Sequence, residues 1–135
     1  MLIFDSFALI VLFERQIGWQ IVHDLIDDSI AKGTLHLVSA INFGEFYYLD
    51  AIKHGYEHAE QLMELARRLP IRIHVPTFED IMEAAHLKGG SGASYADCFA
   101  AALALKENAA VLTGDPDFRK LEEYGVKVEW LPRNR

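Results

Sequence analysis

The chain has 135 residues, 51% of them hydrophobic and 24% charged, and its 20 acidic side chains outnumber 13 basic ones to give a formal net charge of −7. This length and composition are typical of one globular domain and exclude an intrinsically disordered chain, while the negative charge argues against a protein that coats nucleic acid by electrostatic attraction. The single cysteine, Cys98, excludes a disulfide framework and a cysteine-based zinc site, and it favours a reducing, cytoplasmic compartment.

The distribution of apolar residues indicates neither a membrane span nor a cleaved leader. The longest unbroken apolar run covers residues 98–105, far short of the ~18 residues that cross a bilayer. The apolar N-terminus has no basic segment and is interrupted by Asp5, which argues against a signal peptide. Because there is no repeat, and no linker rich in Pro, Gly or Ser beyond residues 89–92, we interpret residues 1–135 as a single domain.

The first part of the chain alternates short apolar runs with helical patterns. Leu2–Phe4 predicts a strand, and apolar residues at helical spacing predict one helix over Phe7–Ile30. Gly33 then indicates a turn, and Leu35–Val38 predicts a second strand. A helix over Ile41–His54 follows and ends at a glycine.

The middle of the chain continues this alternation. A helix over Tyr56–Leu69 stops before a proline, and Ile71–Val75 predicts a third strand. Thr77 as N-cap, with Asp80 three residues later, predicts the start of another helix. Residues 89–92, Gly-Gly-Ser-Gly, predict a flexible loop after it, and they lack the Gly-x-x-x-x-Gly-Lys pattern of a phosphate loop.

The last part adds two strands and two helices. Ser94 predicts the N-cap of a helix over Tyr95–Glu107, followed by a strand over Ala110–Leu112. A short helix over Pro116–Tyr124 and a strand over Val126–Trp130 complete the pattern. Strands that alternate with helices predict the α/β class, with three layers in α/β/α order and a mostly parallel sheet of about five strands.

Five acidic residues map to one edge of this predicted sheet. In such sheets the carboxyl ends of the strands and the amino ends of the following helices lie at the same edge, where ligands bind. One acid follows the first strand, one lies in the first turns of the helix after the second strand, one lies three residues after Ser94, and two follow the fourth strand. They are Asp5, Glu45, Asp97, Asp115 and Asp117.

Taken singly, most of these acids have a purely structural explanation. Asp5 and Asp115 can cap the helices that follow them. Asp97 can stabilise the positive end of a helix dipole, an effect of ~0.3–1 kcal/mol. The five acids as a group, rather than any one of them, therefore indicate a chemical role.

Glu45 is the acid that capping explains least. Ile41, Leu49 and Ile52 form an apolar stripe at helical spacing around it, which indicates that its carboxylate points inward. Buried carboxylates are rare unless they are paired or bind a metal.

Clustered carboxylates at this edge need a counter-charge, because they repel one another and their burial adds a desolvation penalty. No lysine or arginine stands at a matching position in the sequence, so a divalent cation is the expected partner. Hard oxygen ligands favour Mg²⁺ or Mn²⁺ over zinc. Such ions support the hydrolysis of phosphodiesters.

Four segments of the sequence resemble the acidic motifs of PIN-domain ribonucleases. They are Asp5-Ser6, Glu45 within SAINFGEFYY, Asp97 within SYADCFAAALAL and Asp115 within VLTGDPDF. The resemblance covers essentially the whole chain in order, and its most specific part is Ser91–Phe118. At this length the chain resembles a stand-alone PIN domain, the VapC-type toxin of a toxin–antitoxin pair.

The resemblance implies a PIN-like fold and an endoribonuclease that hydrolyses RNA with one or two Mg²⁺ or Mn²⁺ ions. It also implies a homodimer that a small antitoxin inhibits. The implied metal-binding and catalytic acids are Asp5, Glu45, Asp97 and Asp115, with Asp117 as an accessory metal ligand and Ser6 and Thr113 as supporting polar residues.

Other functions remain open at this point. The main alternative is a non-catalytic PIN-fold module that binds metal or a partner, although a scaffold has little use for clustered acids. A receiver-like signalling module is disfavoured because Ser6, and not a second acid, follows Asp5. A Mg²⁺-dependent phosphatase is disfavoured because no Asp-x-Asp motif follows the first strand.

RNA would also need basic contacts, although most basic residues are interpreted as solvated surface. The candidates are Lys53, Arg67, Arg68, Arg119, Lys120, Arg133 and Arg135. His54 and His58 have a spacing that can bind metal, but the glycine between them favours surface histidines. The helices containing Phe43–Leu49 and Leu62–Leu65 predict an apolar patch that suits a dimer or an antitoxin equally well.

Overall fold

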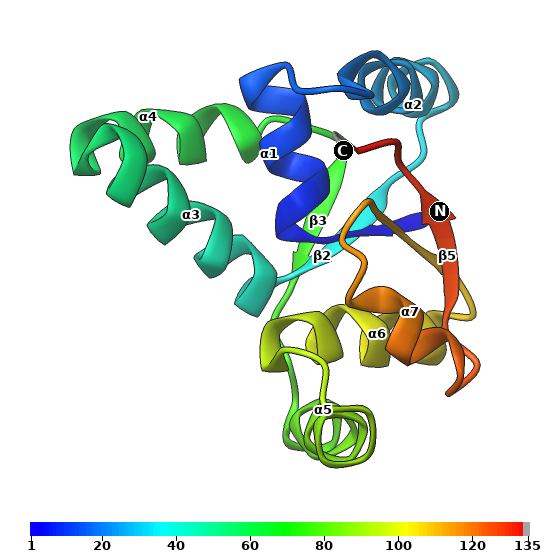
Figure 1. Ribbon diagram of the computed structural model, residues 1–135. Helices are drawn as coiled ribbons and strands as arrows, with labels where there is room; N and C mark the ends of the chain where they lie inside the picture. Colours follow the sequence, from blue (N-terminus) through cyan, green and yellow to red (C-terminus); the bar gives the residue numbers. More distant parts are fainter. Residues whose placement is uncertain (134–135) are drawn as a thin grey trace.

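The computed structural model describes residues 1–133, which form three α/β/α layers around a five-stranded sheet (Figure 1). The strand order is β3-β2-β1-β4-β5, and all neighbouring pairs are parallel. This confirms the predicted α/β class and the parallel sheet. The strands are β1 (Leu2–Phe4), β2 (His36–Ser39), β3 (Ile71–His74), β4 (Ala110–Thr113) and β5 (Lys127–Trp130).

Helices cover both faces of the sheet. In Figure 1 the helices of the first half of the chain lie above the sheet and to its left, and those of the second half lie below it. The first group comprises α1 (Ser6–Glu14), α2 (Trp19–Lys32), α3 (Ala40–His54) and α4 (Tyr56–Ala66), and the second comprises α5 (Phe78–Ser91), α6 (Tyr95–Glu107) and α7 (Phe118–Glu122).

The strands separate two hydrophobic cores because successive side chains point to opposite faces. Ile3 and Val111 belong to the core under α5–α7, whereas the next residue of each strand, Phe4 and Leu112, belongs to the core under α1–α4. All four side chains are fully buried. The two central strands therefore contribute to both cores, which explains their continuous apolar runs.

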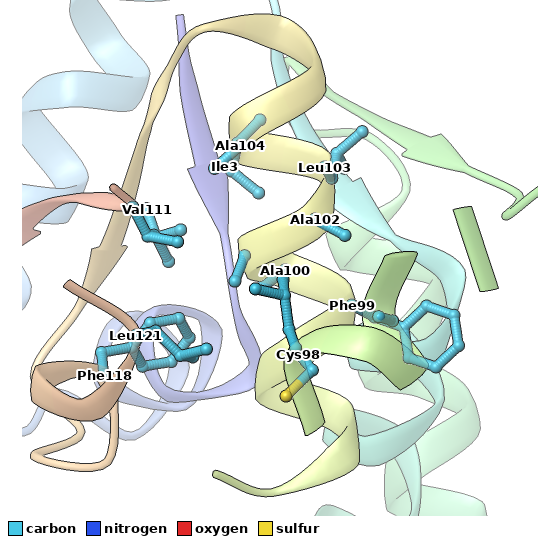
Figure 2. Close-up of a cluster of buried hydrophobic side chains, with 14 of the residues drawn as sticks. Ile3, Cys98, Phe99, Ala100, Ala102, Leu103, Ala104, Val111, Phe118 and Leu121 are labelled. Carbon is cyan, nitrogen blue, oxygen red and sulfur yellow. The ribbon is translucent and has the colours of Figure 1, made fainter. Parts of the chain in front are cut away.

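Helix α6 lies against the sheet along an alanine-rich face. Ala100, Ala101 and Ala104 are buried, and Figure 2 shows this helix beside the side chains of Ile3 and Val111. Small side chains let the helix backbone approach the strands closely. The alanines on the same side as Asp97 are therefore core residues, as their spacing indicates.

The predicted helix over Phe7–Ile30 is wrong in one respect, since the structure has two helices there. Helix α1 ends at Arg15, which adopts a left-handed backbone with φ 50°, and α2 begins after Gly18, which has φ 92°. The apolar periodicity continues on both sides of this turn. Hydrophobic spacing alone therefore did not reveal the break.

The predicted loop over residues 89–92 is also wrong, because α5 continues through Ser91. Gly92, with φ 74°, ends the helix. A β-carbon on Gly90 would lie 2.6 Å from the hydroxyl oxygen of Tyr124, so this glycine permits close packing of α5 against the segment before β5. The glycines here serve helix termination and packing.

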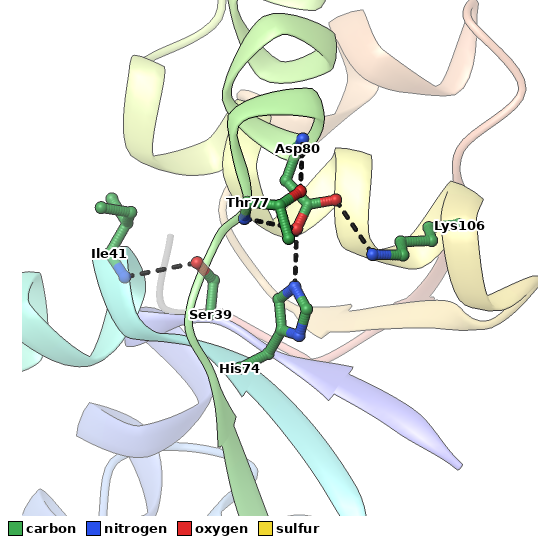
Figure 3. A network of polar contacts seen from close by, with 6 residues as sticks. All are labelled: Ser39, Ile41, His74, Thr77, Asp80 and Lys106. Carbon is green, nitrogen blue, oxygen red and sulfur yellow. Dashed lines mark hydrogen bonds and ion pairs between the residues drawn. The ribbon is translucent and has the colours of Figure 1, made fainter.

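A polar network fixes the start of α5 to the rest of the molecule (Figure 3). The capping box predicted from Thr77 and Asp80 is present, with Thr77 N–H donating to Asp80 Oδ2 at 2.9 Å and Asp80 N–H donating to Thr77 Oγ1 at 3.1 Å. Asp80 also pairs with His74 Nε2 at 2.8 Å and with Lys106 Nζ at 3.2 Å. One carboxylate thus connects β3, α5 and α6.

Within residues 1–133, none of the helices has the length and apolar character needed to cross a bilayer.

Candidate active site

Asp5 lies at the carboxyl end of the central strand β1. Its side chain is the N-cap of α1, where Oδ1 accepts a hydrogen bond from Ala8 N–H at 2.9 Å. The residue is only 1% exposed. The capping explanation is therefore correct for Asp5, but a solvent-exposed serine or aspartate would cap equally well, so capping does not account for its burial.

The environment of Asp5 disfavours its charged form. Burial raises the pKa of its carboxyl to about 7, hydrogen bonds from Thr113 and Ala8 partly counteract this rise, and repulsion from Asp115 and Glu45 adds to it. Thr113, one of the predicted supporting residues, thus contacts Asp5 directly. The repulsion also shows that acids from three separate segments lie near one another.

Asp97 lies in the first turn of α6, on the opposite side of the sheet from α1. Ser94 caps this helix, and its Oγ accepts a hydrogen bond from Asp97 N–H at 3.2 Å. The aspartate is 5% exposed. Burial, followed by repulsion from Asp115 and Asp5, raises the pKa of its carboxyl to about 8, with a smaller contribution from Glu45.

Glu45 reaches the same edge from α3. Ser6 Oγ donates a short hydrogen bond to Glu45 Oε1, so the second predicted supporting residue also contacts one of the predicted acids. The reasoning from an apolar stripe was wrong, however. Ile41, Leu49 and Ile52 are 41%, 38% and 80% exposed, and this stripe is an outer surface of α3 that does not pack into the core.

Asp115 and Asp117 occupy the loop between β4 and α7. Asp115 Oδ1 accepts from Asp117 N–H at 2.9 Å, and Asp117 Oδ2 accepts from Ser94 N–H at 2.8 Å. The first bond lies within the loop, and the second connects the loop to the start of α6. Lys120 Nζ lies 2.9 Å from Asp117 Oδ1 and, together with Ser94 N–H, lowers the pKa of Asp117.

Lys120 corrects the expectation that no basic residue stands at this edge. It belongs to α7, three residues after Asp117, and it neutralises the outermost acid. Asp5 and Asp97, which are buried, have no ion pair with a lysine or arginine among residues 1–133. The accessory acid is thus electrostatically different from the buried ones.

Asn42 is a buried residue at this edge that the sequence reasoning missed. It is fully buried in α3, three residues before Glu45, and its Nδ2 donates to Ala96 O in α6 at 3.0 Å. Its Oδ1 has no hydrogen-bond partner within the described part of the chain. The sequence signal that could have identified Asn42 is its position one helical turn before Glu45, which places both side chains on the same side of the helix.

The donor set fits a hard divalent cation in its chemistry, because it offers carboxylate oxygens and the buried acids lack a counter-charge. The geometry is less complete. Across residues 1–133, no group of three or more His, Cys, Asp or Glu side chains is arranged so that it could hold a metal ion. The acids therefore interact electrostatically without forming a finished ligand set.

Two of the basic residues predicted to contact RNA are engaged with other side chains. Lys53 pairs with Glu14 at 2.9 Å, and the guanidinium of Arg119 stacks over Trp130 at 4.8 Å from its ring centroid. Arg135 lies outside the described residues. Arg133, in contrast, lines a cleft together with Asp115.

The two histidines are partly exposed, as expected for surface residues. Their rings lie 4.7 Å apart, and each contacts one carboxylate: His54 contacts Glu14 at 3.3 Å, and His58 contacts Asp50 at 2.7 Å. They connect the corner between α3 and α4 with the end of α1.

Comparison with known proteins identified one family and several similar folds. A family model described as "PIN domain" matches residues 2–124. The search of curated proteins found no match.

Solved structures of toxins resemble the chain over nearly its full length. The toxin VapC20 of Mycobacterium tuberculosis, described as "Sarcin-Ricin loop cleaving toxin", has a TM-score of 0.75 at 17% identity and covers 98% of this chain and 100% of its own. VapBC2 of Rickettsia felis, bound to a DNA fragment from its promoter, has a TM-score of 0.72 at 14% identity, with 96% and 98% covered. A toxin–antitoxin complex from Klebsiella pneumoniae has a TM-score of 0.69 at 16% identity, with 99% and 100% covered. At these identities the likeness establishes a shared fold.

Proposed function

The chain belongs to the PIN domain family, and from this premise we propose that it is an endoribonuclease that uses Mg²⁺ or Mn²⁺ to hydrolyse RNA. The observation that carries the proposal is the mutual repulsion of acids from four separate segments. At one sheet edge, repulsion from Asp115 and Glu45 adds to burial in raising the pKa values of Asp5 and Asp97. Buried carboxylates that repel one another reduce the stability of the fold, and such groups with perturbed pKa values cluster at functional sites.

In the proposed mechanism, Asp5, Glu45, Asp97 and Asp115 hold one or two divalent cations, with Asp117 as an accessory ligand. A bound cation supplies polarisation of the phosphoryl group and activation of water. Ser6 and Thr113 hold Glu45 and Asp5 in position through their hydroxyl groups.

The buried acids can also move protons near neutral pH. With pKa values of about 7 and about 8, Asp5 and Asp97 are partly protonated near neutral pH, and nearby positive charge favours loss of the proton. Asn42 supports this arrangement by fixing α3, which carries Glu45, to the amino end of α6.

We further propose that the protein is the toxin of a VapBC-type pair, that it is a homodimer, and that it acts in the cytoplasm. Structures with a similar fold include toxin–antitoxin complexes, which supports an antitoxin partner. The exposed apolar stripe of α3, formed by Ile41, Leu49 and Ile52, is available for such a partner or for a second copy.

The deciding experiment is cleavage of a mixed RNA substrate by the purified protein with Mg²⁺, with Mn²⁺ and with EDTA. The test variant is Asp97→Asn, and the matched control is Asp24→Asn, whose side chain is 83% exposed on α2. We expect metal-dependent cutting by the wild type and the control, and a loss of about 100-fold or more in Asp97→Asn. Equal cutting by both variants would contradict the assignment of Asp97.

A second candidate function is a non-catalytic PIN-fold module that binds metal or a partner. It is favoured by one observation, the lack of a finished metal-ligand arrangement among residues 1–133. In that case the same protein, free of any co-purified inhibitor, would leave RNA intact under all three conditions.

A further inference from the structure

A cleft of about 410 Å³ opens directly beside Asp115. Its walls come from α1, from the turn between α1 and α2, and from the segments that follow β4 and β5. The helix break that hydrophobic spacing failed to predict therefore forms part of this cleft. Its volume lies within the ~300–1,000 Å³ typical of small-ligand sites.

Two glycines allow apolar rings to form the walls. A β-carbon on Gly114 would lie 2.6 Å from Cε1 of Phe7, so only glycine lets this ring lie against the loop that carries Asp115. Gly18 has φ 92°, and a β-carbon there would lie 3.0 Å from the ring of Pro132. Phe7 and Pro132 can therefore pack closely against the backbone at Gly114 and Gly18, where a larger side chain would displace these rings.

The cleft combines apolar rings with two kinds of polar group. Phe7 and Pro132 supply flat apolar surfaces, and Gln16 supplies a carboxamide, whose Nε2 donates to Glu14 at 2.9 Å and whose oxygen can accept. Arg133 brings a positive charge to the same cleft that Asp115 lines. A flat aromatic ligand with a polar edge, carried on a negatively charged backbone, matches all three features.

We infer that this cleft is a subsite for one nucleobase of the RNA, next to the position where the acids would hold the phosphodiester that is hydrolysed. The inference rests on the proposed function. The base stacks against Phe7, Gln16 hydrogen-bonds its edge, and Arg133 contacts the adjoining phosphate. Since Gln16 is the group that reads the base edge, it is a specificity-determining residue.

The first test measures which bases surround the cut. An RNA pool with a randomised window is cleaved by the full chain, and sequencing of the new ends gives the base frequencies on each side of the cut. The variants are Gln16→Ala and Phe7→Leu, and the matched control is Gln61→Ala, an exposed glutamine on α4 that does not line the cleft. We expect the wild type and Gln61→Ala to share a preference at one position, and Gln16→Ala to lose it.

The second test measures binding without cleavage. A fluorescent RNA hexamer of random sequence is titrated with each protein in EDTA, and the folding of each variant is checked by its thermal unfolding. We expect Phe7→Leu and Gln16→Ala to weaken binding at least about fivefold relative to Gln61→Ala, the lower end of what base stacking contributes.

The outcomes separate this inference from the proposed function. If the wild type cuts RNA but the variants keep its base preference and its affinity, the subsite is wrong and the nuclease stands. If the wild type does not cut but the variants weaken RNA binding, the nuclease is wrong and the subsite stands. If the wild type binds no RNA, or if folded variants bind it as the control does, the subsite is overturned.

Discussion

Asp97 is a buried carboxylate whose surroundings add negative charge rather than remove it. Its neighbours Asp115, Asp5 and Glu45 are all acidic, and Ser94 caps its helix without providing a positive charge. A residue selected for stability alone would be an asparagine, which makes similar contacts without the penalty of ionisation. The carboxylate therefore reduces stability at a place where we propose that it serves catalysis.

The raised pKa of Asp97 predicts that the stability of the protein depends on pH. The pKa of Asp97 is about 8 in the folded chain against an ordinary value of 3.8, so between about pH 4 and pH 8 the folded state holds a proton that the unfolded state has lost. Unfolding then releases protons, and the free energy of unfolding falls as pH rises. In EDTA we expect Asp97→Asn to gain about 2 kcal/mol on the wild type at pH 8, and much less at pH 5.

Urea unfolding at pH 5, 6, 7 and 8 measures this difference, with Asp24→Asn as the control. Asp5 contributes to the remaining slope because its pKa of about 7 is raised in the same direction. Identical pH slopes for the wild type and Asp97→Asn would refute the expected burial of an uncompensated charge.

Asp80 behaves in the opposite way. Burial alone would raise its pKa, but hydrogen bonds from Thr77, His74 and Lys106 outweigh burial and hold the pKa well below its usual value. We expect Asp80→Ala to lower the free energy of unfolding by about 2 kcal/mol at pH 7, because it removes a capping box and two further contacts.

Because the folded pKa of Asp80 is depressed, its contribution is present above about pH 4 and declines as the pH falls further. Chemical denaturation at pH 7 and pH 3 should therefore show a smaller effect of Asp80→Ala at pH 3. Glu79→Ala removes the neighbouring exposed acid and should change stability by less than about 0.5 kcal/mol. A similar loss in both variants would exclude a specific role for the network.

Helix α5 contains two adjacent glycines with different surroundings. A β-carbon on Gly89 would meet nothing within 4 Å, whereas one on Gly90 would lie 2.6 Å from the hydroxyl oxygen of Tyr124. Both lie within the helix. We expect Gly89→Ala to stabilise the protein by about 0.5–1 kcal/mol through helix propensity, and Gly90→Ala to lose that gain because Tyr124 must move.

Thermal unfolding of the two variants side by side tests this pair, and each serves as the other's control. Tyr124→Phe in the Gly90→Ala background removes the obstructing oxygen and should restore part of the gain. Equal stabilisation by both alanines would mean that α5 and the segment around Tyr124 are not held in close contact.

The elements differ in how well the sequence predicted them. The cap at Thr77 and the cap at Ser94 were recognised because each depends on residues three positions apart. The turn between α1 and α2 was missed because it depends on the left-handed backbone of Arg15 and Gly18, which leaves no trace in hydrophobic spacing. Local signals were therefore sufficient for helix starts but not for this break.

The candidate site was predicted by topology more than by the surroundings of single residues. The carboxyl ends of the strands bring Asp5 and Asp115 to one edge, as the alternation of elements implied. The prediction that Glu45 points inward was supported by a wrong argument, since Ile52 and its neighbours face outward. Asn42 was missed because its partner in α6 lies 54 positions away in the sequence.

Metal binding should be coupled to the free energy of unfolding of the whole protein and to the release of protons from its buried acids. A ligand that binds only the folded state stabilises it by ~2.7 kcal/mol at 100 times its dissociation constant. We expect Mn²⁺ to raise the unfolding temperature by about 5 °C or more at pH 8, and by less at pH 6, because Asp5 and Asp97 must lose protons first.

Thermal scans with and without Mn²⁺ at both pH values check this prediction. Asp24→Asn should keep the shift, and Asp97→Asn should lose most of it. A shift that survives in Asp97→Asn would place the ion elsewhere on the protein.

The order of the strands has a consequence for how the protein is made. The central strand β1 leaves the ribosome first, whereas β4, which completes its hydrogen bonding on one side, comes more than a hundred residues later. The edge that unites Asp5 with Asp115 consequently cannot assemble on a nascent chain until most of that chain has emerged.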